Sequence, residues 1–176
     1  MVKPFAALYF KQLNKTLDLI DLATLERIVN TLLDAYKNEK TIFVFGNGGS
    51  GATASHFAGD FNKGISYKLK KKFKVLCLND NVPAMLAFAN DCSFEDVFVE
   101  QLKNFLKPED VVIAISGSGN SKNVLNAIAY ANENKAVSIG LTGFKGGKLK
   151  ELAQLCLLAP IEDMEKTEDI HLIIMH

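Results

Sequence analysis

The chain is predicted to be an α/β protein, a three-layer α/β/α sandwich with a five-stranded parallel sheet. Short apolar runs alternate with segments in which apolar residues recur at helical spacing, from residue 41 to the end of the sequence. Two of these runs end in glycine- and serine-rich turns that lead directly into a helical segment. Such alternation is typical of a parallel sheet that carries helices on both faces.

Two amphipathic helices are expected before the first strand, over residues 5–20 and 23–38. Their apolar residues recur at helical spacing: Phe5, Leu8, Tyr9, Leu13, Leu17 and Ile20 in the first, and Leu25, Ile28, Val29, Leu32, Leu33 and Tyr36 in the second. Two helices are more than a single sheet needs at this point. Residues 1–40 are therefore expected either to pack against another subunit or simply to cover the sheet.

Five short apolar runs are predicted to be the strands: residues 41–45, 73–78, 111–115, 136–142 and 155–159. Helices are expected over residues 51–62, 84–90, 94–106, 121–134 and 148–154, and from 164 to the end. Local signals support these bounds. Pro83 suits a helix start, Ser93 can cap the next helix, and Pro108 and Pro160 stop a helix and a strand.

Length and composition limit the kinds of protein that the chain can be. At 176 residues it is predicted to be a single domain over 1–176 with a sizeable core. A formal net charge of zero argues against a nucleic-acid binder, and no apolar run is as long as a membrane span. Residues 1–4 begin no signal peptide, and the three cysteines form no Cys-x-x-Cys pair, so we expect a cytoplasmic protein with reduced thiols.

The first predicted strand ends in a glycine-rich turn, residues 46–50, which read Gly-Asn-Gly-Gly-Ser. Backbone amides exposed at the start of the following helix, together with the helix dipole, make such a turn a ready anion site. Asn47 and Ser50 can add side-chain hydrogen bonds. No Lys-Ser or Lys-Thr pair follows, so the turn is not a Walker A loop, and its spacing differs from Gly-x-Gly-x-x-Gly.

A second turn of the same kind follows the third strand, where residues 116–121 read Ser-Gly-Ser-Gly-Asn-Ser. Its three serines supply hydroxyl donors. The chain has only one arginine, Arg27, so a phosphate would be held by hydroxyls and backbone amides rather than by a guanidinium. Two such turns at the carboxyl ends of parallel strands predict a sugar-phosphate site, although each could also be merely a tight turn between a strand and a helix.

Histidines and carboxylates on two predicted helices could bind a divalent metal or move protons. His56 and Asp60 are four residues apart and share one helix face. The last helix carries more residues of this kind: Glu165, Glu168, Asp169, His171 and His176. By spacing alone, Glu168 and His171 could chelate a metal as a pair. The alternative is a solvated surface helix, on which such residues are common.

The two turns, together with the His56-Phe-Ala run after the first, resemble the sugar isomerase (SIS) domain family and, within it, the phosphoheptose isomerase branch. The resemblance runs from about residue 41 to the end. It implies a flavodoxin-like sheet and an aldose–ketose isomerisation of sedoheptulose 7-phosphate to D-glycero-D-manno-heptose 7-phosphate through an enediol, in heptose biosynthesis for lipopolysaccharide or capsule. It also implies zinc as a cofactor and a homotetramer with sites between subunits, for which residues 1–40 would supply an interface.

In this branch a histidine and a glutamate on the first-loop helix, and a glutamine and a histidine on the last helix, bind zinc. The resemblance places His56, Asp60, Glu168 and His176 at these positions, with Asp in place of Glu and Glu in place of Gln. Asp60, or alternatively Glu168, would be the base that removes the proton next to the carbonyl. His176 would be the acid, and His176 rather than His171 is expected at the metal.

The same resemblance assigns the residues that would bind the substrate. The hydroxyls and backbone of the two turns would hold the phosphate and the nearby sugar, and acidic residues would complete the site. The residues so assigned are Asn47, Gly48, Ser50, Asp91, Ser116, Gly117, Ser118, Ser121, Glu165 and Glu168. Two other kinds of SIS protein are alternatives: a non-enzymatic relative that binds the bacterial replication initiator but lacks the terminal histidine, and a sugar-phosphate sensor, which usually carries a DNA-binding domain.

Overall fold

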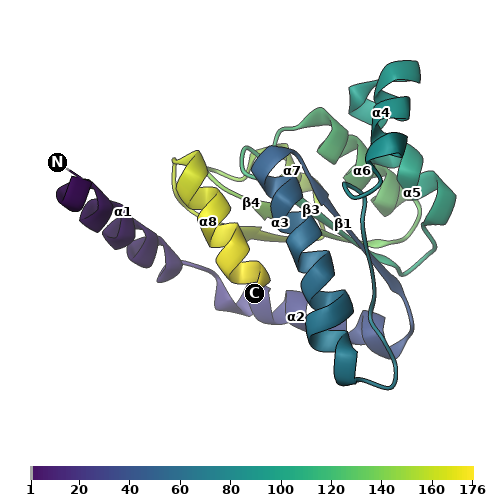
Figure 1. Cartoon of the computed structure of the whole chain (residues 1–176), viewed down its shortest axis with the longest axis horizontal. Coiled ribbons are helices and arrows are strands. Elements are labelled where there is room, and N and C mark those ends of the chain that lie inside the picture. The colour runs from purple at the N-terminus through teal and green to yellow at the C-terminus, as the bar shows by residue number, and fades with distance from the viewer. Residues whose placement is uncertain (1) are drawn as a thin grey trace.

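A five-stranded parallel sheet lies between two layers of helices in the computed structural model, which describes residues 2–176 (Figure 1). The strands are β1 (Thr41–Gly46), β2 (Lys74–Cys77), β3 (Val111–Ser116), β4 (Val137–Thr142) and β5 (Leu155–Leu158). They lie in the order β2-β1-β3-β4-β5, and every pairing is parallel. The predicted α/β/α fold is confirmed, and each strand begins and ends within one residue of its expected bounds.

The helices follow the expected sequence of elements, with some changes at their ends. The α-helices are α1 (Val2–Leu17), α2 (Leu22–Lys37), α3 (Gly48–Gly59), α4 (Val82–Asp91), α5 (Val99–Phe105), α6 (Lys122–Glu133), α7 (Gly147–Leu152) and α8 (Met164–Met175). A π-helix, Asp60–Ile65, continues α3, and Ser66–Lys68 and Phe94–Asp96 are single 3₁₀ turns. None of the helices described over residues 2–176 combines the length and the apolar character that crossing a membrane requires.

Alternate side chains of the central strands enter two separate cores, one on each face of the sheet. Ile42 and Val44 of β1 pack with α2, α3 and α8. Phe43 and Phe45 point to the other face and pack with α5, α6 and α7, where the Phe45 ring stacks on Phe98 at 4.6 Å. Because successive side chains of a strand alternate between faces, this arrangement fixes α3 and α8 on the same side of the sheet.

The two N-terminal helices have different surroundings. α2 covers the sheet, since Ile28 and Leu32 are buried in its core. α1 projects from the body of the molecule (Figure 1) and leaves Phe5 and Phe10 exposed at 70% and 63%. Tyr9 links it to α8: its hydroxyl donates a hydrogen bond to Asp169 Oδ2 at 2.6 Å, and Lys166 Nζ lies 4.6 Å from the centre of its ring. The expectation of a sheet-covering helix therefore holds for α2, whereas α1 presents an apolar surface to solvent.

The helix after the first strand begins at Gly48, three residues before the expected start at Gly51. The turn packs closely against β3, and only glycine fits at its start, because a Cβ on Gly46 would lie 2.7 Å from the Ile115 carbonyl oxygen of β3 and 2.8 Å from Ser50. Gly48 makes the turn with a φ of 52°, in the left-handed region that favours glycine. The N-terminus of α3 therefore stands directly at the end of β1.

Candidate active site

A pocket lies at the point where the strand order reverses, between β1 and β3. Gly46 at the end of β1 pairs in register with Ile115 of β3, so the two loops that follow these strands start side by side. Ligands of open α/β sheets bind at such switch points, beyond the carboxyl ends of the strands. The pocket has a volume of ≈ 260 Å³ and is lined by Asn47, Gly48, Gly49, Ser50, Ile115, Ser116, Gly117, Ser118, Ser121, Met164 and Glu168.

Two of the acids assigned to the substrate do not line this pocket. Asp91 is exposed in the last turn of α4, where its Oδ1 accepts a hydrogen bond from Asn90 Nδ2 at 2.7 Å. Glu165 is exposed in the first turn of α8. All the other residues assigned to the substrate lie together at the pocket.

The two helices that start at the pocket lack the side-chain caps found elsewhere in the chain. Among the helices described with Asp, Asn or Ser at the N-cap, those capped by Asp21, Asn81, Ser93 and Asp163 each have a backbone amide bonded to the cap side chain. Asn47 before α3 and Ser121 before α6 make no such bond, although both residue types are strong N-caps. The amides at the start of α3 are therefore left for another acceptor, as an anion site requires, whereas in α6 the Val124 amide is already accepted by Asn123 Oδ1 at 3.0 Å.

The side chain of Asn47 is held by a second asparagine, Asn123. Asn47 Nδ2 donates to Asn123 Oδ1 at 2.9 Å, and Asn123 Nδ2 donates to Asn47 Oδ1 at 2.8 Å. Asn123 is 2% exposed and lies in the first turn of α6. Sequence reasoning missed this residue; the only signal was an asparagine two positions after the serine-rich turn. The pair ties the loop after β1 to the helix after β3.

The serine-rich turn is folded so that its hydroxyls face one another. Ser116 Oγ and Ser121 Oγ are 3.4 Å apart, and Ser116 Oγ also accepts the Gly119 amide at 3.2 Å. Ser118 Oγ accepts the amide of Asn120 at 3.2 Å. A hydroxyl that accepts a backbone amide still has its own proton to donate. The turn thus offers O–H donors at the pocket, without a fixed charge.

Three side chains of types that can bind a metal ion lie close together farther along α3, two from α3 and its π-helix and one from the end of α8. His56 Nε2 is 2.9 Å from His176 Nε2 and 3.3 Å from Asp60 Oδ2, and His176 Nε2 is 3.8 Å from the same oxygen. The ligand atoms of these three residues all lie within 4.8 Å of one another, and each side chain is about half exposed. Asp60 is the first residue of the π-helix, a distortion that is frequent at functional sites. Two imidazoles and a carboxylate suit Zn²⁺.

Glu168 is not part of this group. Its carboxylate stands against Gly49 in the first turn of α3, where a Cβ on Gly49 would overlap it. Glu168 and His176 are eight residues apart on α8, about 12 Å along the helix at 1.5 Å per residue. The structure therefore separates the four residues assigned to zinc, with His56, Asp60 and His176 together and Glu168 at the pocket.

The pocket and the cluster of His56, Asp60 and His176 (the His–Asp–His group) lie along one seam between α3 and α8. Gly49 faces Glu168 at one end of the seam, and His56 faces His176 at the other. The seven residues from Gly49 to His56 correspond to about 10 Å of helix. An anion bound at the start of α3 and a reacting group near His56 could therefore belong to one elongated molecule.

His171 has a structural environment. It is 1% exposed, and its Nε2 lies 3.0 Å from the carbonyl oxygen of Thr142 at the end of β4. Burial lowers the pKa of His171 below its ordinary value, which keeps the ring neutral. Because its ring is buried in the core, His171 does not pair with Glu168 at a metal, and the assignment of His176 to the metal stays a prediction.

Known proteins resemble this chain in sequence and in structure. The SIS domain family profile matches residues 8–143. The phosphoheptose isomerase of Helicobacter pylori (strain ATCC 700392 / 26695) is 37% identical over 153 residues, which make up 86% of this chain and 79% of that protein. A probable phosphoheptose isomerase of Thermoplasma volcanium is 33% identical over 168 residues, covering 96% of this chain and 85% of the relative.

Among solved structures, the phosphoheptose isomerase GmhA from Neisseria gonorrhoeae superposes with a TM-score of 0.92. The two chains are 27% identical, and the superposition covers 100% of this chain and 95% of the other. The likeness extends through α1, which projects from the body of the molecule.

Proposed function

The chain belongs to the SIS domain family, and from this premise we propose that it is an isomerase that interconverts sedoheptulose 7-phosphate and D-glycero-D-manno-heptose 7-phosphate. The observation that carries the proposal is the seam between α3 and α8, with an uncapped helix N-terminus at one end and a His–Asp–His group about 10 Å away. A seven-carbon sugar phosphate is long enough to occupy both ends. The names of the relatives from Helicobacter and Thermoplasma point to the same reaction.

The phosphate would bind at the pocket. The amides at the start of α3 and the hydroxyls of Ser116, Ser118 and Ser121 are donors that suit phosphate oxygens. The helix dipole adds a favourable field for a negative charge. Binding of the phosphate at one end would place the carbonyl end of the sugar toward His56 and Asp60.

The isomerisation needs one base and one acid at neighbouring carbon atoms. Asp60 would take the proton from the carbon next to the carbonyl, while His176 gives a proton to the carbonyl oxygen, and the product is a cis-enediol. Return of a proton to the former carbonyl carbon, with loss of the proton of the hydroxyl on the neighbouring carbon, completes the conversion. Glu168 is the alternative base, because its carboxylate lies at the pocket itself. Positioned acid–base groups contribute about 10²–10⁴-fold to such reactions.

We also propose that zinc is held by His56, Asp60 and His176. Their three ligand atoms are mutually close and are of the types that zinc binds. A zinc ion bound there would supply a Lewis acid that polarises the carbonyl. The proposal rests on these three residues, since Glu168 lies at the other end of the seam.

Incubation with sedoheptulose 7-phosphate, with and without added zinc, tests the proposed function. We expect the aldose product to form until both isomers are at equilibrium, and chelation to reduce the rate. The control is a six-carbon ketose 6-phosphate, which should react more slowly because it spans less of the seam. No conversion of the heptose phosphate by zinc-loaded protein would exclude the proposal.

Replacing Ser118 and Ser121 together by alanine should weaken sugar-phosphate binding by more than about tenfold. Each hydrogen bond to an ionised oxygen contributes about 1.5–3 kcal/mol, and the double change removes two donors at the pocket. Calorimetric titration gives the affinity, and circular dichroism checks the fold. Ser93→Ala is the matched control, because Ser93 caps a 3₁₀ turn away from the pocket. Unchanged affinity in the double variant would contradict the assignment of the phosphate site.

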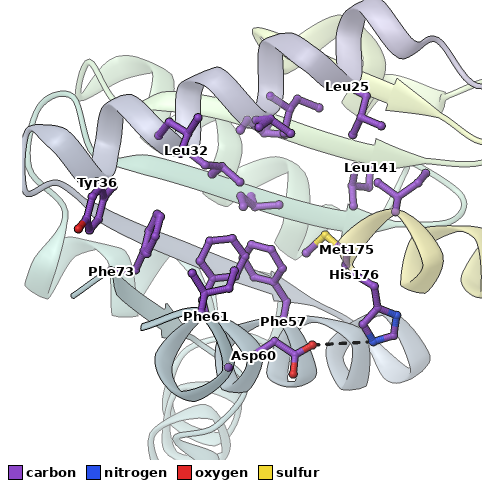
Figure 2. A pocket seen from close by; sticks show the side chains of 18 of the residues that line it. Leu25, Leu32, Tyr36, Phe57, Asp60, Phe61, Phe73, Leu141, Met175 and His176 are labelled. Carbon is purple, nitrogen blue, oxygen red and sulfur yellow. Dashed lines mark ion pairs between the residues drawn. The ribbon is translucent and has the colours of Figure 1, made fainter. Parts of the chain in front are cut away.

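We propose that the protein is a homo-oligomer, with a tetramer as the expected state. A groove of ≈ 790 Å³ runs between α2 and α3 and is lined mainly by apolar side chains, among them Leu25, Leu33, Phe61 and Phe73. Figure 2 shows that Asp60 and His176 lie at its edge. The exposed apolar side chains of α1 offer a second surface of the same character. Association through these surfaces would bury apolar area and cover the His–Asp–His group.

Light scattering at micromolar concentration should report a tetramer, or at least a dimer, of the 19.3 kDa chain. Leu33→Glu, which places a charge in the groove, is expected to shift the population toward the monomer. Phe105→Glu is the matched control, because Phe105 is also apolar and exposed but belongs to α5, which packs on the other face of the sheet. A fully active wild-type monomer would refute self-association as a requirement of the site.

A further inference from the structure

An unusual feature of the pocket is that a strong N-cap residue stands at the start of α3 without capping it. The first intrahelical bond of α3 runs from the Gly51 amide to the Asn47 carbonyl at 3.2 Å, so the amides of residues 48–50 precede it. An asparagine at the N-cap normally accepts one of these amides with its side-chain oxygen. Asn81 does so before α4, where its Oδ1 accepts the Ala84 amide at 3.3 Å.

The reason is that the Asn47 side chain is already used. Its Oδ1, the atom that would cap α3, accepts a hydrogen bond from Asn123 Nδ2 at 2.8 Å, and its Nδ2 donates back at 2.9 Å. Asn123 is itself fixed, because it is buried and its Oδ1 also accepts the Val124 amide at 3.0 Å. The partner that holds Asn47 away from the helix is thus a side chain with little freedom to move.

We propose that Asn123 is a positioning residue: by pairing with Asn47 it withholds the cap of α3, so that the amides of residues 48–50 stay available to the phosphate of the substrate. The inference rests on the proposed function, since it concerns the same pocket. Asn123 need not touch the substrate for this role, and it does not line the pocket. Without Asn123, the Asn47 oxygen would turn to the Gly49 or Ser50 amide, and an anion would have to displace it.

The expected effect of Asn123→Ala is a loss of affinity for an anion without loss of the fold. A helix cap contributes enough free energy that its displacement should weaken inorganic phosphate binding roughly fivefold. KM for the sugar phosphate should rise by a similar factor with kcat within about twofold, because the amide contacts hold the phosphate equally in the ground and transition states. Asn123→Ser is the second variant if the alanine protein folds poorly.

The double variant Asn47→Gly/Asn123→Ala separates this role from a structural one. Glycine has no side chain that can cap α3, so phosphate affinity should return to within about twofold of wild type. A merely structural Asn123 predicts that the double variant binds as weakly as Asn123→Ala, or more weakly. Calorimetric titration with inorganic phosphate measures all three proteins, because this probe presents no sugar that Asn47 could contact.

The outcomes distinguish this inference from the proposed function. If wild-type protein binds no phosphate, the proposed pocket fails and the inference fails with it. If wild type binds and Asn123→Ala binds equally well, or the double variant is not restored, only the positioning role is overturned. Weakened binding in the single variants and recovery in the double variant support it.

Discussion

Replacing His176 by alanine is expected to abolish turnover of sedoheptulose 7-phosphate and to lower the zinc content of the protein. His176 Nε2 lies 2.9 Å from His56 Nε2 and 3.8 Å from Asp60 Oδ2, so the change removes one of the three proposed metal donors and the proposed acid. Loss of a general acid alone costs about 10²–10⁴-fold in rate. Measurement of kcat/KM, together with zinc per chain after dialysis, tests both parts of this expectation.

His171→Ala, on the same helix, is the matched control. His171 is buried, with Nε2 3.0 Å from the Thr142 carbonyl oxygen. It is not a member of the His–Asp–His group. Its loss should lower the midpoint of thermal unfolding, because it leaves a cavity and removes one of the two contacts of the Thr142 carbonyl oxygen, which also accepts the Ala159 amide at 2.8 Å. Zinc content and measurable turnover should remain. If His171→Ala lost zinc and His176→Ala kept it, the assignment of the terminal histidine would be wrong.

The sheet could be predicted from the sequence because its three central strands, β1, β3 and β4, are buried on both faces. Continuous apolar runs such as 111–115 mark strands of this kind, and the turn residues that follow β1 and β3 mark their ends. The two loops of the pocket were therefore predictable as a pair. The start of α3 was less predictable, because the glycines at 48, 49 and 51 have low helix propensity although they lie within the helix.

The finer geometry of the site depends on contacts that no local pattern records. Asn47 and Asn123 are 76 positions apart, and only the folded sheet brings them together. Glu168 and His176 differ by about 80° around the helix, which is compatible with one face, yet their separation along the axis is about 12 Å. The axial rise is what places Glu168 at the pocket and His176 at the His–Asp–His group.

The two carboxylates that could serve as the base thus occupy opposite ends of the seam. Asp60 is within 4 Å of both histidine rings, beside the expected position of the carbonyl. Glu168 lies against the first turn of α3, where the phosphate is expected. A carboxylate at that end would repel a phosphate rather than remove a proton from carbon. This contrast favours Asp60 as the base. It also predicts that loss of the Asp60 carboxylate impairs catalysis, whereas loss of the Glu168 carboxylate improves binding of the substrate.

Asp60→Asn is expected to lower kcat by about 10²–10⁴-fold, because the amide has the same shape but neither the charge nor the basicity of the carboxylate. Zinc content should fall as well, since a donor oxygen of the His–Asp–His group loses its charge. Glu168→Gln is the matched variant, again an isosteric change of acid to amide, and it should keep kcat within about tenfold. It should also lower KM, because removal of a negative charge beside Gly49 favours the phosphate. Steady-state kinetics on both variants decides between the two carboxylates: a collapse of kcat in Glu168→Gln with activity retained in Asp60→Asn would make Glu168 the base.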